Sequence, residues 1–278
     1  MSDTEILSRI HTIPPVDTKF VAGRWHHDRA ALDGFLVEAR VFLKSKIVPH
    51  NDNKRFLVLG RARSGTTLLT RLLNGHSHIH CDGEVLKYNM LSPRRHFERL
   101  AGKSSSRIYG AKVLSHQMVQ VHRMRQPQKF LGKLVAHGVH LIHLERDTFF
   151  QTLSLTIAQR RKQYHSHKGA EALEQKIYLE PQEFLSRLSW NEALLSYERA
   201  ALLDLPNTHI LYEQDLGSTA IQKRTLERIY NVLGVPAEPM NTPIRKILPS
   251  TPEDIIENYD EIHQAIEKSG RSYLLSNV

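Results

Sequence analysis

The chain has 278 residues, of which 40% are hydrophobic and 24% charged, and this composition excludes the disordered and fibrous classes. The formal net charge of +9 indicates anionic partners. Because the basic residues are dispersed and lack interleaved aromatics, we expect an anionic cofactor and no nucleic acid. No apolar run reaches the roughly 20 residues of a membrane span, and the first 15 residues lack a secretory-signal pattern, so we expect a cytoplasmic protein.

The first predicted elements surround a short apolar run. Residues 1–27 look irregular, with a breaker at Pro14–Pro15, and residues 28–46 carry apolar residues at helical spacing. Residues 56–59 then indicate a buried strand. The segment TTLLTRLLN, residues 66–74, indicates the helix that follows it.

Apolar segments and longer amphipathic segments alternate along the rest of the chain. We predict strands at 107–114, 138–145 and 208–213, and helices near 115–136, 147–165, 181–203 and 218–233. This order is typical of βαβ units and a parallel sheet. We therefore predict one domain over residues 1–278, a P-loop-containing three-layer α/β/α fold with a central, mainly parallel sheet. Ligands bind beyond the carboxyl ends of the strands in such sheets.

A glycine-containing loop joins the first predicted strand to its helix. Gly60 and Gly65 have the spacing of the phosphate-loop pattern GxxxxGK[ST]. Glycines let successive backbone N–H groups point at one anion, and the helix N-terminus adds a partial positive charge. Side chains that suit phosphate oxygens are Arg61, Arg63, Thr66 and Thr67. Thr66 replaces the lysine of the pattern, so the loop lacks the usual equipment for phosphoryl transfer.

The segment RARSGTTLLTRLL, residues 61–73, resembles sulfotransferases that use PAPS (3′-phosphoadenosine 5′-phosphosulfate), especially bacterial and carbohydrate-type members. The resemblance runs from about residue 54 to 265. It implies a sulfotransferase-like fold, PAPS as co-substrate and no metal. In that family such a loop binds the 5′-phosphosulfate, which implies contacts from Arg61, Arg63, Ser64, Gly65, Thr66 and Thr67.

A second match ends a predicted strand at HLERDT, residues 143–148. The family holds the 3′-phosphate with an arginine at this strand end and a serine eight residues later. The resemblance therefore assigns Arg146 and Ser154 to the 3′-phosphate. A surface arginine beside a helix-capping Asp147 is the alternative interpretation of the same residues.

Two weaker matches lie further along the chain. Residues 210–216, ILYEQDL, resemble a segment whose tyrosine lies near the adenine, which implies Tyr212, although helix capping by Asp215 explains the segment equally well. Arg245 and Lys246 stand where the family places a loop that closes over the nucleotide. The surrounding residues do not reproduce the RKG signature of the aryl members, so the assignment of this pair to the nucleotide stays open.

Sulfuryl transfer needs a grip on the leaving phosphate, stabilisation of charge and a base. The loop, with Arg63 as a catalytic residue, can supply the first two. The resemblance points to Glu84 as the base, although a free glutamate has a pKa of about 4.3 and needs desolvation. Rival bases are His76, His78, His80, His116 and Asp82. Lys112 could position the reactants, but we favour its interpretation as a surface lysine.

The function predicted from these motifs is transfer of the sulfuryl group of PAPS, by in-line displacement, to a hydroxyl of a carbohydrate or other small alcohol. An atypical P-loop kinase with a magnesium carboxylate at Glu145 or Glu213 is one alternative. A non-catalytic nucleotide- or nucleic-acid-binding protein is another. Cys81 is the single cysteine, and we interpret it as a half-buried residue rather than as a catalytic nucleophile.

Overall fold

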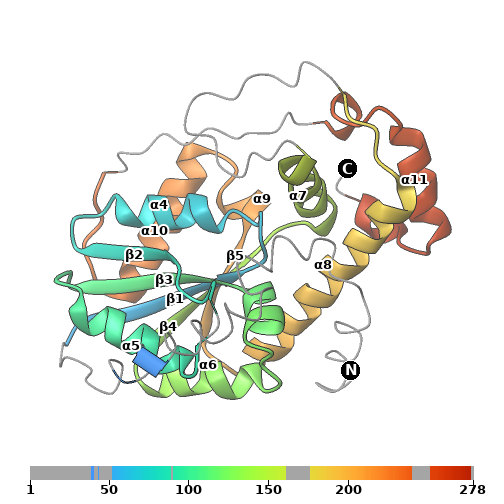
Figure 1. Cartoon of the computed structure of the whole chain (residues 1–278). Coiled ribbons are helices and arrows are strands. Elements are labelled where there is room, and N and C mark those ends of the chain that lie inside the picture. Colours follow the sequence, from blue (N-terminus) through green and yellow to red (C-terminus); the bar gives the residue numbers. More distant parts are fainter. Residues whose placement is uncertain are drawn as a thin grey trace.

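The fold is built on a five-stranded parallel sheet in the order β2-β3-β1-β4-β5 (Figure 1). It is seen in a computed structural model that describes residues 52–88, 90–160, 176–239 and 251–276, with 39, 40 and 43. The strands are β1 (Lys54–Gly60), β2 (Ile79–Glu84), β3 (Ile108–Leu114), β4 (Val139–Glu145) and β5 (Asn207–Leu211). Because all five run in one direction, their carboxyl ends meet at one edge of the sheet.

Helices connect the strands and follow the last one. They are α4 (Thr66–Asn74), α5 (Pro93–Lys103), α6 (Pro127–Ala136), α7 (Thr148–Arg160), α8 (Pro181–Leu202), α9 (Tyr212–Asp215), α10 (Thr219–Leu233) and α11 (Tyr259–Lys268). Short turns of other helix types are η1 (Gln117–Val121), η2 (Pro252–Asp254) and η3 (Ser272–Leu275). Within the described part of the chain, no helix has both the length and the apolar character needed to cross a bilayer.

Alternating side chains of the central strand β1 divide the core into two layers. Phe56 and Val58 pack in a cluster with residues of α4 and α10 on one face of the sheet. Leu57 and Leu59 pack on the opposite face, in a cluster with residues of α5, α6 and α8. Successive residues of a strand point to opposite faces, so one buried strand serves both layers. The result is the three-layer α/β/α arrangement visible in Figure 1.

A third apolar cluster lies beside the sheet and fixes the position of α7. Phe149 and Leu153 of α7 are buried against Phe184 and Leu188 of α8, together with residues of α11. Since α7 begins three residues after β4 ends, this packing holds its first turn at the carboxyl edge of the sheet.

The structure confirms the predicted fold class and most of the predicted elements. One strand, β2, was missed, because only alternate residues of this edge strand are deeply buried and its sequence IHCDGE is largely polar. The helix predicted near 115–136 is instead the π-helical turn η1 followed by α6, and the strand predicted to reach residue 213 ends at Leu211. The predictions for 1–27, for most of 28–46 and for Arg245 and Lys246 lie outside the described residues.

Candidate active site

The loop between β1 and α4 is tightly wound at the carboxyl end of the central strand. Gly65, the N-cap of α4, has φ of 99°, and a Cβ there would lie 2.4 Å from the ring of Tyr212. Arg63 is also left-handed, with φ of 67°. The Ser64 hydroxyl donates to the Arg61 carbonyl at 2.8 Å and closes the turn. The loop therefore requires glycine at 65 both for its backbone conformation and for space.

Arg61 points into the protein. Its side chain is fully buried, and the guanidinium donates to the hydroxyl of Thr148 at 3.0 Å and to the carbonyls of Asn191 at 3.2 Å and Arg146 at 2.6 Å. The expectation that this side chain contacts a phosphate is therefore corrected, because the guanidinium is buried among protein acceptors. The guanidinium instead joins the loop to α7, to α8 and to Arg146, the residue after β4.

Arg63 links the two groups of residues that the motifs had assigned to opposite ends of a nucleotide. Its Nε donates to the Ser154 hydroxyl at 3.2 Å, and its carbonyl accepts from Nη1 of Arg146 at 2.9 Å. The resemblance had assigned Arg146 and Ser154 together to the 3′-phosphate, and in the structure the arginine that contacts Ser154 is Arg63. Burial, and next the positive charge of Arg146, lower the pKa of Arg63.

Arg146 lies between the loop and the first turn after β5. Its guanidinium carbon is 4.5 Å from the centre of the Tyr212 ring, and its Nε is 3.6 Å from a carboxylate oxygen of Glu213. The neighbouring Asp147 accepts from the Phe150 N–H and so caps α7. The capping interpretation of Asp147 is therefore correct, and Arg146 is not a surface arginine beside it.

Asp215 has a different structural role from the one considered in the sequence. Its carboxylate accepts from the Leu211 N–H at 2.8 Å and pairs with Arg228 at 3.2 Å. The N-cap of α10 is Ser218, whose hydroxyl accepts from the Ile221 N–H. Asp215 thus fastens the turn that carries Tyr212.

A second polar group lies at the ends of β2 and β3. The Lys112 ammonium is 3.1 Å from the Thr67 hydroxyl and 3.2 Å from a carboxylate oxygen of Glu84. The other oxygen of Glu84 accepts from Nε2 of Gln117 at 2.8 Å. Lys112 is 5% exposed, so its interpretation as a surface lysine was wrong. The signal for this role is a lysine inside the otherwise apolar strand IYGAKVL.

The rival bases are separated by their places along β2. His76 and His78 precede this six-residue strand, and Glu84 is its last residue, so roughly 17–20 Å of strand lies between them. His80 pairs with Asp82 at 3.1 Å. Of the candidate bases on or before β2, Glu84 is the one that the structure pairs with Lys112.

Two other groups near Glu84 are changed by burial. Burial lowers the pKa of His116 to about 4, while the Glu84 carboxylate acts against that change. His116 is therefore neutral at pH 7. Burial also raises the pKa of the Cys81 thiol, so Cys81 is not an activated nucleophile.

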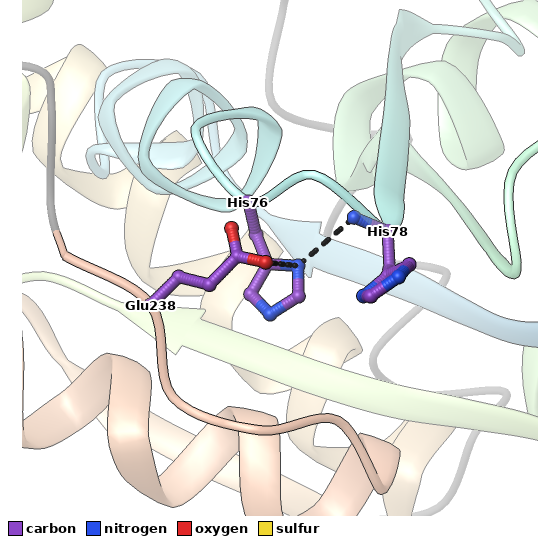
Figure 2. Close-up of side chains that lie close together, drawn as sticks. All are labelled: His76, His78 and Glu238. Carbon is purple, nitrogen blue, oxygen red and sulfur yellow. Dashed lines mark hydrogen bonds and ion pairs between the residues drawn. The ribbon is translucent and has the colours of Figure 1, made fainter.

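His76, His78 and Glu238 bring three potential metal-ligand atoms within 4.8 Å of one another (Figure 2). Nδ1 of His76 accepts from the backbone N–H of His78 at 3.1 Å, and Nε2 contacts the Pro236 carbonyl at 2.9 Å. Glu238 accepts from the Ser77 N–H at 2.8 Å. With both ring nitrogens of His76 held by the backbone, the arrangement fastens the segment after α10 to the turn before β2.

Comparisons with known proteins find one family model and several solved structures similar to this chain. Residues 55–137 match the family model described as the sulfotransferase family. No curated protein sequence matches the chain. A solved sulfotransferase from Alicyclobacillus acidocaldarius is 12% identical, with a TM-score of 0.44 over 82% of this chain and 98% of that one. A mouse sulfotransferase solved with PAP is 12% identical, with a TM-score of 0.48 over 87% and 89%.

The segment matched by the family model contains the glycine loop of residues 61–65, Glu84 at the end of β2 and Lys112 on β3. In the structure Lys112 contacts both Glu84 and Thr67, a residue of the helix turn that follows this loop. Over residues 55–137, the part that holds this loop and these two side chains, the chain is similar to the sulfotransferase family.

Proposed function

We propose that the protein transfers the sulfuryl group of PAPS to an acceptor hydroxyl. The observation that supports this most is the contact of Arg63 with both Arg146 and Ser154. A loop suited to one phosphate and a pair suited to another are joined by a single side chain. A nucleotide that carries phosphates on both its 3′ and 5′ positions has the chemistry to use both.

The 5′ end of the nucleotide is proposed to bind at the N-terminus of α4. This helix begins after Gly65, which has no side chain to satisfy the first N–H groups, so these groups and the helix dipole are available to an anion. Ser64 and Thr66 belong to this turn, and Thr67 presents its hydroxyl beside Lys112. Arg63 supplies the positive charge of the loop.

The 3′-phosphate is proposed to bind between Arg146 and Ser154, where Arg63 now donates to the serine hydroxyl. A phosphate oxygen can accept from the same groups, and charge-assisted hydrogen bonds of this kind are the strong ones. Tyr212, which already stacks on Arg146, is proposed to lie near the adenine. Arg245 and Lys246 remain proposed nucleotide contacts on the evidence of their sequence position.

For the chemical step we propose Glu84 as the base. It takes the proton of the acceptor hydroxyl while the acceptor oxygen bonds to sulfur, and the bond from sulfur to the 5′-phosphate oxygen breaks. The products are a sulfate ester and adenosine 3′,5′-bisphosphate. Lys112, which lies between Thr67 and Glu84, is placed to balance negative charge on the group in transfer.

The acceptor is proposed to be a carbohydrate or another small alcohol. The kinase alternative loses support from the partners of the two carboxylates that it needs. Glu145 pairs with Arg199 at 2.7 Å and with His209 at 3.1 Å, and Glu213 lies beside Arg146. A magnesium ion would have to displace these partners.

The proposal is tested by supplying PAPS and a panel of hydroxyl acceptors in the presence of EDTA. We expect release of adenosine 3′,5′-bisphosphate together with a sulfated product, and a large loss of both in Glu84→Gln. Turnover of ATP that requires magnesium, with none of PAPS, would replace the proposal by the kinase alternative.

A further inference from the structure

The proposed mechanism gives no role to a group of buried ionisable side chains beside the loop. Arg61 and Glu198 are both 0% exposed, and His143 is 4% exposed. The three come from the end of β1, from α8 and from β4. Charged side chains are almost never fully buried unless they are paired, so this group needs an explanation.

Arg61 makes its hydrogen bonds to neutral acceptors. They are the hydroxyl of Thr148, the side-chain oxygen of Gln151 and two backbone carbonyls. These bonds satisfy the geometry of the guanidinium without cancelling its charge. Burial lowers the pKa of Arg61, and the carboxylate of Glu198 is the largest of the effects that oppose this.

Glu198 is a buried carboxylate with few hydrogen-bond partners. One carboxylate oxygen lies 3.1 Å from Nε2 of His143, and the other has no hydrogen-bond partner among the described residues. A buried carboxylate with a single hydrogen-bond partner is costly unless a positive charge lies nearby. The buried cation of Arg61 meets that need.

The geometry of α8 puts Glu198 on the side of the helix that contacts Arg61. Asn191, whose carbonyl accepts from Arg61, precedes Glu198 by seven residues, which places both on one face of the helix. Helix side chains point toward the N-terminus, so the carboxylate of Glu198 extends back along α8 toward Asn191. His143 is stacked on His209 of β5 at 5.2 Å between ring centres, which keeps its imidazole in position.

We propose that Glu198 is the counter-charge of Arg61, that His143 orients its carboxylate, and that the three act as positioning residues for the nucleotide site. Two hydrogen bonds connect this group to the backbone of the proposed nucleotide site. Arg61 donates to the carbonyl of Arg146 at 2.6 Å, and Gln151 donates to the carbonyl of Ala62 at 2.5 Å. If the guanidinium moves, the backbone that aims Arg63 and Arg146 moves with it.

The charge pairing is tested by a double-mutant cycle on urea unfolding, which is independent of the proposed function. We expect Glu198→Gln and Arg61→Met each to lower the folding equilibrium constant about 100-fold or more, because each leaves one buried charge. The double variant is expected to be at least about tenfold more stable than additivity predicts. Additive losses of stability overturn the pairing. A double variant that does not fold, when each single variant folds, overturns it as well.

The positioning role rests on the proposed function and is tested by calorimetry with adenosine 3′,5′-bisphosphate. We expect Glu198→Gln and His143→Leu to weaken binding about tenfold or more, and His143→Gln, which keeps a donor at the same reach, to restore most of it. Glu183→Gln is the matched control, because Glu183 pairs with the buried Arg187 on the same helix, and binding there should stay within about twofold.

The outcomes separate the two claims. Full nucleotide affinity in Glu198→Gln overturns the positioning role even if the cycle shows coupling. If the unaltered protein does not bind the bisphosphate, the proposed function fails, and the urea cycle alone still decides whether Arg61 and Glu198 are partners.

Discussion

The Nε of Arg63 donates to the hydroxyl of Ser154 at 3.2 Å, across 91 positions of the chain. The two residues come from the loop after β1 and from the second turn of α7. This contact joins the site proposed for the 5′-phosphosulfate to the site proposed for the 3′-phosphate. Changes to either residue should therefore be felt most by ligands that carry both groups.

Ser154→Ala removes the hydroxyl that Arg63 contacts. We expect affinity for adenosine 3′,5′-bisphosphate to fall about tenfold, because a hydrogen bond to a charged group contributes roughly 1.5–3 kcal/mol. Affinity for AMP should change little. The control is Thr156→Ala on the same helix, whose hydroxyl bonds within α7. An equal loss for both nucleotides would remove Ser154 from the 3′ site.

Arg146→Ala removes the charge proposed to hold the 3′-phosphate. Calorimetry should show a loss of about 10- to 100-fold for the bisphosphate and a much smaller loss for AMP. Arg228→Ala, which removes an exposed arginine paired with Asp215, should leave both affinities unchanged. Equal weakening of the two nucleotides by Arg146→Ala would show that the residue only supports the loop through the Arg63 carbonyl.

Glu84→Gln keeps the shape of the side chain and removes the proposed base. We expect kcat to fall about 100-fold or more, as for other general bases, while bisphosphate affinity stays within about twofold. The measurement is steady-state turnover with the identified acceptor, paired with calorimetry. Full activity would transfer the role of base to His116, and His116→Asn then becomes the decisive variant.

Stability should depend on pH through His116. Burial lowers its pKa to about 4, below the usual value of about 6.5. As pH falls below 6.5 the unfolded chain takes up a proton that the folded protein refuses until about pH 4, so stability present above pH 6.5 is lost in that window. Between pH 6.5 and 5 this group should remove about 2 kcal/mol.

His116→Asn should flatten that slope, and His263→Asn, which changes a partly exposed histidine on α11, should not. Urea unfolding at pH 5 and pH 7 measures both. His96, His122 and His140 have pKa values lowered by burial in the same direction, so some slope is expected to remain in His116→Asn. Identical slopes in the unaltered protein and His116→Asn would contradict the assignment.

The parts of the fold that the sequence predicts are those with a strong local signal. The buried apolar strands β3 and β4 were predicted to within one residue at each end, and the strand predicted at 56–59 is the buried middle of β1. The edge strand β2 alternates between buried and exposed positions and contains Asp82 and Gly83, which resemble a turn. Its pairing with β3 is a tertiary effect that no local pattern contains.

The candidate site was predictable in its chemistry and only in part in its geometry. Glycine spacing indicated the loop. Its two arginines point in different directions, because Arg61 is buried inside the protein and Arg63 contacts Ser154. The direction of a side chain depends on backbone angles and on packing partners such as Thr148, which is 87 positions from Arg61. The buried environment of Lys112 likewise arises from the pairing of β2 with β3.

The most direct test of the account is calorimetry of the unaltered protein with adenosine 3′,5′-bisphosphate, compared with ATP and AMP, in EDTA. The account predicts one site that binds the bisphosphate at least about tenfold more tightly than either competitor, since only that ligand has phosphates for both the loop and the Arg146 and Ser154 pair. Tighter binding of ATP, or equal affinity for the bisphosphate and AMP, would contradict it.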